Sequence, residues 1–199
     1  MAEYIAPRGT RDVLPEETPK WQYLEAKFRE ACNLYGYGEI RTPTFEYTEL
    51  FTRNLGETTD VVSKEMYTFE TKGSRSLTLR PEGTAPTIRA YVQNNLGASV
   101  PVAKLYYIAR AFRYERPQAG RYREHTQLGI EAIGSMDPAL DAEVAWLQGY
   151  GSLALMSDLS EIDRPSFERE LMFRADEVRR AVELRRPPES SAEDSRNVH

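Results

Sequence analysis

Residues 111–131 concentrate the side chains that could bind a charged substrate. Two segments of alternating character flank a loop containing Pro117 and Gly120, which is typical of a long hairpin loop. Guanidinium groups form paired hydrogen bonds with phosphate and carboxylate oxygens, so these arginines favour a polyphosphate ligand such as ATP. A solvated surface loop with weak ion pairs is the alternative. The arginines of this segment are Arg113, Arg116, Arg121 and Arg123.

Alternation along the two segments predicts strands with one polar and one apolar face. Arg113 and Glu115 are in phase on the first strand, and Gln127, Gly129 and Glu131 are in phase on the second. Positions four apart on a strand are separated by roughly 13 Å, which leaves room for a small amino acid above the glycine. The opposite face should pack against a core through Leu128, Ile130 and Ala132.

Carboxylates for a cationic ligand are available at Glu82 and Glu131, and Thr84 adds a hydroxyl beside the first. A glutamate at the start of a helix can equally interact with the helix dipole, and this alternative stays open for Glu82. The sequence has no Walker loop, no dinucleotide fingerprint and no evident serine, histidine and aspartate constellation.

Composition narrows the class of protein. The chain has 199 residues and a net charge of -5 at pH 7, which argues against coating of nucleic acid by the whole surface. Cys32 is the single cysteine and excludes an intramolecular disulfide, and only His125 and His199 add imidazole donors, which argues against a zinc site. No apolar run reaches the length of a membrane span, so we expect a cytoplasmic protein.

The first half of the chain predicts a helix, a bent strand and a hairpin. Residues 18–35 carry apolar side chains every three or four positions, and Thr18 should cap that helix. Residues 39–46 predict a strand that Pro43 confines to an edge or a bend. Residues 66–70 and 76–80 predict a hairpin in which Gly73 supplies the positive φ.

The second half predicts the elements that carry the arginine-rich loop, together with two helices. A helix should begin after residue 84 and end at Gly97, strands should cover 104–115 and 124–134, and Asp137 with Pro138 should start another helix. Residues 1–150 are expected to form the core, 151–186 a charged helical extension of unknown role, and 187–199 a disordered tail.

Five segments resemble the amino-terminal half of the catalytic domain of histidyl-tRNA synthetase. They occur in the family order over about residues 5 to 148. The resemblance implies an α+β fold, with the antiparallel sheet of class II synthetases flanked by helices, incomplete here and followed by the helical extension. The segments are Pro-Arg-Gly-Thr-Arg-Asp (7–12), Tyr-Gly-Glu-Ile-Arg-Thr-Pro (37–43), Glu-Met-Tyr-Thr-Phe (65–69), Leu-Arg-Pro-Glu-Gly-Thr-Ala (79–85) and Phe-Arg-Tyr-Glu-Arg-Pro-Gln-Ala-Gly-Arg-Tyr-Arg (112–123).

The resemblance also implies roles for single residues. Glu82 and Thr84 would hold the α-amino group of histidine, with Gln127 helping to place the amino acid, and Glu131 would contact the imidazole. Arg113 would act as the catalytic residue by bridging the histidine carboxylate and the α-phosphate of ATP. The remaining ATP-binding residues would be Glu115, Arg121, Arg123 and His125.

The implied reaction is formation of histidyl-adenylate and pyrophosphate, followed by transfer of histidine to tRNA(His). Mg2+ would bridge the phosphates, and a homodimer is expected. His125 and Thr126 depart from the phenylalanine and histidine that the family often has there. Beyond residue 149 we find neither the later histidine motif, nor the third class II motif, nor an anticodon-binding domain, so the enzyme could be inactive alone.

Three functions therefore compete. The first is a histidine–tRNA ligase catalytic region. The second is a histidine-sensing protein like the synthetase-related subunit of ATP phosphoribosyltransferase, which would not need the ATP arginines. The third is a fragment without function. Glu82 and the intact arginine-rich loop favour the first.

Overall fold

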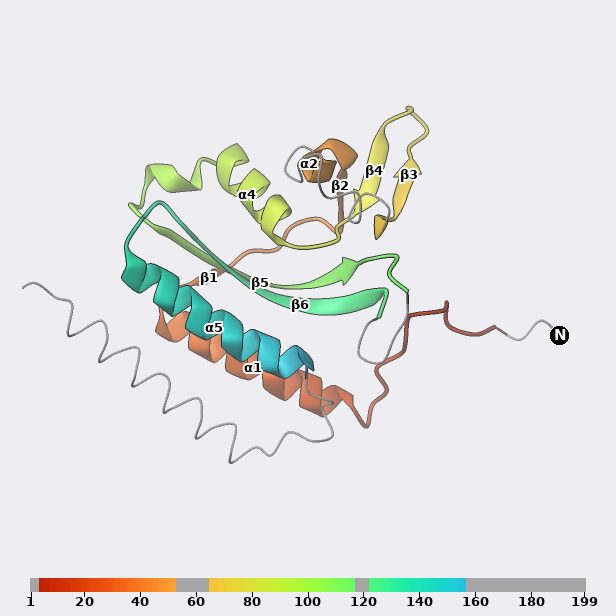
Figure 1. Ribbon diagram of the computed structural model, residues 1–199, viewed down its shortest axis with the longest axis horizontal. Helices are drawn as coiled ribbons and strands as arrows, with labels where there is room; N and C mark the ends of the chain where they lie inside the picture. Colours follow the sequence, from red (N-terminus) through yellow and green to blue (C-terminus); the bar gives the residue numbers. More distant parts are fainter. Residues whose placement is uncertain (1–3, 53–64, 117–121, 157–199) are drawn as a thin grey trace, which may run out of the picture.

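The computed structural model describes residues 4–52, 65–116 and 122–156, with side chains described as far as Leu147. Its helices and strands form a mixed α+β fold in which antiparallel pairing dominates, as expected (Figure 1). The elements are α1 (Thr18–Leu34), β1 (Gly38–Glu39), β2 (Phe45–Tyr47), α2 (Thr48–Thr52), β3 (Thr68–Glu70), β4 (Ser76–Leu79), α4 (Thr84–Gln93), the 3-10 helix η1 (Leu96–Ala98), β5 (Ala103–Phe112), β6 (Glu124–Ile133) and α5 (Pro138–Met156).

The larger sheet has the order β1-β5-β6. Its two long strands pair antiparallel from Ala103 opposite Ile133 to Phe112 opposite Glu124, which confirms the predicted hairpin strands. The backbone pairing continues one step further, because the amide of Arg113 donates to the carbonyl oxygen of Arg123 at 2.9 Å. The short strand β1 pairs parallel with β5 on the other side.

The smaller sheet has the order β2-β4-β3 and is antiparallel throughout. The strand predicted at 39–46 is divided at Pro43: β1 joins the larger sheet and β2 joins the smaller one, and both are edge strands. The predicted positive φ at Gly73 is wrong, since Ser74 has φ 57°. The amide of Ser74 bonds to the carbonyl of Thr71 at 3.0 Å, so the left-handed residue follows the turn, as in many longer hairpin loops.

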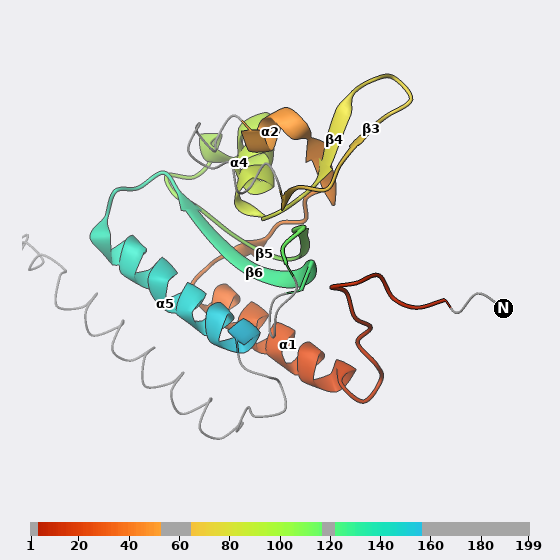
Figure 2. The same cartoon turned by 45° about the vertical axis from the view of Figure 1, so that its right-hand side comes forward.

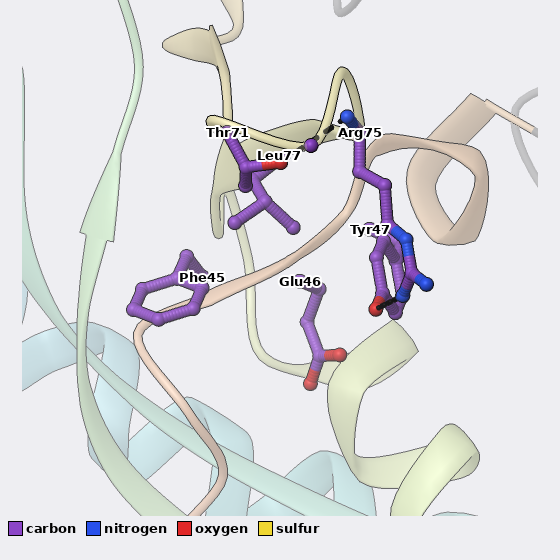
Figure 3. Close-up of a pocket in the computed structure, with 7 residues that line it drawn as sticks. Phe45, Glu46, Tyr47, Thr71, Arg75 and Leu77 are labelled. Carbon is purple, nitrogen blue, oxygen red and sulfur yellow. Dashed lines mark hydrogen bonds between the residues drawn. The ribbon is translucent and has the colours of Figure 1, made fainter.

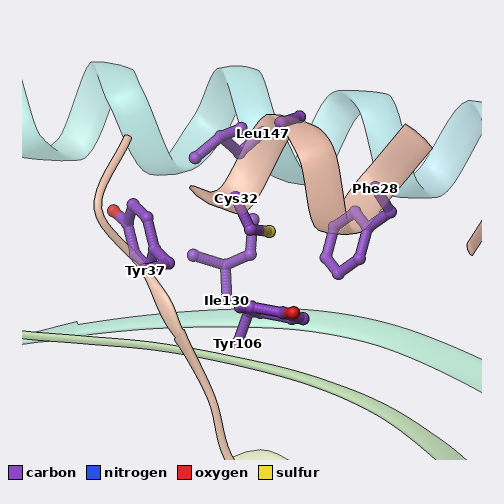
Figure 4. Close-up of a cluster of buried hydrophobic side chains, with 7 residues drawn as sticks. Phe28, Cys32, Tyr37, Tyr106, Ile130 and Leu147 are labelled. Carbon is purple, nitrogen blue, oxygen red and sulfur yellow. The ribbon is translucent and has the colours of Figure 1, made fainter. Parts of the chain in front are cut away.

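Helices cover the larger sheet on both faces (Figures 1 and 2). The helices α1 and α5 lie side by side under one face, and α4 lies over the other. The core under the sheet is built from Phe28, Cys32, Tyr106, Ile130 and Leu147, all buried (Figure 4). Fully burying an apolar side chain of this size contributes about 1.5–3 kcal/mol. Leu128, Ile130 and Ala132 pack in or against this cluster, which confirms the predicted apolar face.

The helix ends follow local hydrogen bonding. The prediction that Thr18 caps α1 is wrong, since Glu17 occupies the cap position and Thr18 is the first helical residue. The hydroxyl of Thr18 donates to the carbonyl of Leu14 at 3.0 Å. Asp137 does cap α5, accepting from the amide of Ala139 at 2.9 Å. The helix α5 runs to Met156, beyond the expected boundary at 150, and the rest of the predicted extension (157–186) and the predicted tail at 187–199 lie outside the described residues.

Arg80 joins the two sheets. Its side chain is 7% exposed. The guanidinium donates to the carbonyl oxygens of Arg110 at 2.7 Å, Thr42 at 2.9 Å and Pro43 at 3.1 Å. Since these acceptors lie on β5 and on the link between β1 and β2, one side chain fixes the smaller sheet against the larger one.

Candidate functional site

The start of α4 lies over one face of the larger sheet (Figures 1 and 2). Gln127, Gly129 and Glu131 alternate along β6, as predicted, and lie opposite Ala109, Tyr107 and Leu105 of β5. The sequence brings α4 to this face through the tight connection from β4, in which Pro81 and Gly83 are buried. Strand residues and a helix N-terminus therefore meet at one place.

Glu82 caps the helix that begins beside it. Its carboxylate accepts hydrogen bonds from the amide of Thr84 and, at 3.0 Å, from the amide of Ala85. The structure thus confirms the helix-terminus role that the sequence left open for Glu82. A carboxylate has about four acceptor positions, so these bonds leave capacity for a further donor.

Gln127 connects the strand to the same turn. Its Oε1 accepts a hydrogen bond from the amide of Gly83 at 2.9 Å. The bond fixes the orientation of the side-chain amide and holds Glu82 and Thr84 above β6. Three of the predicted amino-acid-binding residues are therefore held together by hydrogen bonds.

Tyr107 belongs to this group and was missed from the sequence. Its side chain is 3% exposed and fills the space between Gly83 and Gly129. A Cβ at either glycine would come within 2.0–2.2 Å of the ring. The volume directly above Gly129, which the spacing assigned to a small amino acid, is therefore occupied by a phenol, and a ligand must lie beyond it. A glycine inside a strand signals close approach of another group, and this was the available clue.

Glu131 is partly buried. Burial raises the pKa of Glu131, and the negative charge of Glu82 adds to the increase, while a hydrogen bond with Thr84 opposes it. Burial also raises the pKa of Tyr107, and the charges of Glu131 and Glu82 act in the same direction. The tyrosine therefore stays a neutral phenol beside two carboxyl groups.

Arg113 directly follows the end of β5 and lies next to the turn that carries Glu82. Its Nε donates to the carbonyl oxygen of Pro81 at 2.8 Å, one residue before Glu82. Its Nη1 lies 3.8 Å from Oε1 of Glu115. The pKa of His125 is lowered by burial and further by the charge of Arg113, while the charge of Glu115 opposes the change. The structure thus brings Arg113, Glu115 and His125 together.

Arg123 is directed elsewhere. Its guanidinium lies over the ring of Tyr114, 3.8 Å from the centroid, and its Nε donates to the carbonyl of Glu115 at 3.2 Å. Its Nη1 donates to the carbonyl of Arg8 at 3.4 Å. Arg121 lies outside the described residues.

A separate surface hollow lies at the smaller sheet (Figure 3). It has a volume of ≈ 500 Å³ and is lined by Phe45, Glu46, Tyr47, Arg75 and Leu77, among others. The predicted site residues do not line it. The guanidinium of Arg75 lies over Tyr47 and donates to its hydroxyl at 2.6 Å. We therefore do not assign the predicted chemistry to this hollow.

The described part of the chain offers neither a metal-binding cluster nor a membrane span. Within 4–52, 65–116 and 122–156, no three or more histidine, cysteine, aspartate or glutamate side chains gather where they could hold a metal ion. No helix in these ranges is long and apolar enough to cross a membrane.

Comparison with known proteins gives consistent matches. A family model described as histidyl-tRNA synthetase matches residues 9–152. The histidine–tRNA ligase of Pelotomaculum thermopropionicum is 60% identical over 151 residues, covering 75% of this chain and 36% of the relative. The crystal structure of apo S. aureus histidyl-tRNA synthetase matches with a TM-score of 0.62 at 42% identity, over 76% of this chain and 35% of that one.

A further match is the crystal structure of an ATP phosphoribosyltransferase regulatory subunit/histidyl-tRNA synthetase from Bacillus halodurans C. It gives a TM-score of 0.64 at 28% identity, over 78% of this chain and 39% of that one. The chain spans 33–42% of the length of the curated relatives that it matches.

Proposed function

The chain belongs to the histidyl-tRNA synthetase family, and on that premise we propose that it binds histidine and ATP as part of a histidine–tRNA ligase. The observation that carries the proposal is the hydrogen bond of Arg113 to Pro81, which sets an arginine beside a group of polar residues that could hold an amino acid. That group contains Glu82, Thr84, Gln127 and Glu131.

In this proposal the carboxylates and the amide hold histidine. Glu82 and Thr84 bind the α-amino group, Gln127 orients the substrate and Glu131 accepts a hydrogen bond from the imidazole. Support comes from the Gln127 bond to Gly83 and from the partial burial of Glu131, because a shielded carboxylate interacts more strongly with a donor than an exposed one.

The arginine side would bind ATP. Arg113 contacts the carboxylate of histidine and the α-phosphate, and Glu115 and His125 lie toward the adenine. Arg121 and Arg123 would reach the outer phosphates. Because Arg123 is bound to the carbonyls of Glu115 and Arg8 in this structure, this role requires its guanidinium to change partners.

The reaction is an in-line displacement. A carboxylate oxygen of histidine attacks the α-phosphorus, the bond to the β-phosphate oxygen breaks, and pyrophosphate leaves with the electron pair. Arg113 holds the two reacting groups together and stabilises the negative charge that develops on the α-phosphate. Acyl transfer to the terminal ribose of tRNA(His) would follow.

Magnesium would enter with the nucleotide. Mg2+ is usually held by substrate phosphates, one or two carboxylates and water, and not by a cage of protein ligands alone. Glu115 offers a carboxylate near the arginine side, which suits that mode. The ion would neutralise phosphate charge during the displacement.

We further propose a homodimer acting in the cytoplasm.

A histidine-binding regulatory protein is the second candidate. The match to the Bacillus halodurans C protein, which is named for both activities, favours keeping it. A regulatory protein would bind histidine without needing Arg113 to contact a phosphate.

Histidine-dependent exchange of labelled pyrophosphate into ATP tests the proposal. We expect weak or absent exchange by a protein of these 199 residues, because the chain spans only about two fifths of its ligase relatives. Arg113→Ala should reduce it by about a hundredfold or more. Arg110→Ala is the matched control: this arginine is three residues away, half exposed and paired with Glu124 at 3.5 Å, and its loss should leave exchange within about twofold.

The remaining outcomes separate the alternatives. Histidine binding by calorimetry without exchange would support the regulatory protein. Binding of neither histidine nor ATP would contradict both functions for this chain and leave the fragment. Equal loss of exchange in both arginine variants would contradict the role given to Arg113.

A further inference from the structure

The N-terminal turn, residues 7–10, is bound to the arginine-bearing hairpin although about 110 residues separate them in the sequence. The amide of Thr10 donates to the carbonyl of Pro7 at 3.0 Å, and the hydroxyl of Thr10 donates to the same oxygen at 2.7 Å. Gly9 has φ +85°. A type II turn requires a positive φ at its third residue, which is the place that Gly9 occupies.

A row of backbone hydrogen bonds runs from this turn to the proposed catalytic residue. The amide of Arg123 donates to the carbonyl oxygen of Gly9 at 2.6 Å. The carbonyl of Arg123 in turn accepts from the amide of Arg113 at 2.9 Å. Arg123 is therefore held on both sides, and one of its neighbours in the row is Arg113.

Side chains reinforce the same contact. The Cγ and Cδ atoms of Arg123 would lie 2.8 Å from a Cβ at Gly9, so the arginine stem packs on the glycine backbone. Its Nη1 donates to the carbonyl of Arg8 at 3.4 Å. Arg11 lies over the ring of Tyr122, 5.8 Å from the centroid, and forms an ion pair with Glu17 at 2.7 Å.

These contacts lie at the ends of β5 and β6, and not at the residues proposed to hold histidine. Arg113 and Arg123 sit where β5 and β6 have just ended or not yet begun, so the ladder itself gives them less support than it gives residues further along. A third backbone segment at this point supplies what the two-stranded end lacks. Fixing the backbone matters here, because a small displacement of a positioning group lowers catalysis steeply.

We propose that the N-terminal turn is a positioning element for Arg113 that acts through Arg123. The inference rests on the proposed function for its consequence: loss of the turn should weaken ATP binding more than histidine binding, because Arg113 and Arg123 both contact ATP in that proposal, whereas histidine loses only the contact of its carboxylate with Arg113. Gly9 is then required for two reasons, its positive φ and the arginine stem packed against it.

The test compares Gly9→Ala with Gly36→Ala in the 199-residue chain. Gly36 has φ +77°, and no atom lies within 4 Å of the position that a Cβ would take there, so alanine brings a similar backbone strain at a site away from the hairpin. Amide hydrogen exchange is measured first. We expect protection of the Arg113 and Arg123 amides to fall by about tenfold in Gly9→Ala and to stay within about twofold in Gly36→Ala.

Calorimetric titration with ATP and with histidine follows. Gly9→Ala should weaken ATP binding by about 10- to 100-fold and histidine binding by less than about fivefold. Thr10→Val removes only the hydroxyl bond to Pro7 and should move both measurements in the same direction by a smaller factor. It also keeps the test decisive if Gly9→Ala does not fold.

Unchanged protection at Arg113 and Arg123 in Gly9→Ala, or equal loss in Gly36→Ala, would overturn the inference. So would an equal loss of ATP and histidine affinity. If the unsubstituted chain binds no ATP, the proposed function fails for this chain. The amide hydrogen exchange measurement still decides whether the turn positions Arg113.

Discussion

Tyr107 occupies the space that a side chain at Gly129 would need. The two residues face each other across β5 and β6, and a Cβ at 129 would stand 2.0 Å from Cζ of the phenol. The same ring fills the space above Gly83. The beginning of α4 can therefore approach the strands only because both glycines lack side chains.

Gly129→Ala should destabilise the fold by about 1–3 kcal/mol, because the added methyl group would force the buried ring of Tyr107 to shift. Urea denaturation followed by circular dichroism gives the free energy of unfolding. Gly38→Ala is the control, since it also lies on a strand but its nearest neighbour, the carbonyl of Lys104, is 4.0 Å away. Equal effects of the two changes would contradict this packing.

Arg80→Lys should cost about 2–4 kcal/mol of unfolding free energy, because the single nitrogen of lysine cannot replace both Nε, which bonds the carbonyl of Arg110, and Nη1, which bonds those of Thr42 and Pro43. The same denaturation measurement applies. Arg75→Lys should cost less than about 0.5 kcal/mol, since that arginine is exposed. An unchanged free energy of unfolding in Arg80→Lys would show that the packing of the two sheets does not depend on the guanidinium.

Glu131→Gln should stabilise the chain without ligand while reducing histidine binding. Burial raises the pKa of Glu131 in the folded state above its ordinary value, so its stabilising contribution is complete below the ordinary pKa and is lost as pH rises through the folded one. Ionised Glu131 therefore costs stability at neutral pH, and glutamine removes that cost.

We expect the Tm of Glu131→Gln to exceed that of the unsubstituted chain by about 2 °C near neutral pH, with the difference shrinking toward about pH 4. Differential scanning calorimetry at several pH values checks this. Glu124→Gln, on the same strand, is the control. A difference that grows on acidification would have the wrong sign.

The thiol of Cys32 should not react in the folded protein. The side chain is fully buried, and burial raises the pKa of Cys32 to about 12, so almost no thiolate is present at about pH 8. Ellman's reagent should label it only after unfolding in guanidinium chloride. Rapid labelling of the folded chain would contradict the packing of α1 on the sheet.

Much of the fold follows from periodicity in the sequence. Alternation predicted β5 and β6 and the apolar face through Ile130, and spacing of three and four predicted α1. The division of one predicted strand between two sheets could not be read from Pro43 alone, because it depends on Arg80, a residue nearly forty positions later that becomes buried between them. Burial of an arginine with backbone acceptors leaves no periodic trace.

The candidate site was predicted in part. Residues 127 and 131 share a face, as strand alternation predicted, and residues 82 and 84 lie beside them, as the family resemblance implied. Tyr107 was missed because its apolar ring reads as core, and only its position opposite Gly129 places it at the site. The contacts of Arg123 with Arg8 and Gly9 are equally invisible in sequence, because they join segments about 110 residues apart.

The order of these contacts along the chain has a consequence for synthesis. The helix α1 emerges from the ribosome long before Tyr106 and Ile130, against which Phe28 packs, so its apolar face stays uncovered in the meantime. Gln127 reaches Gly83 across 44 positions, and β1 must wait for β5. Pairings this distant in sequence slow folding, and the face of the sheet that carries Gln127 can be completed only after most of the described chain has been synthesised.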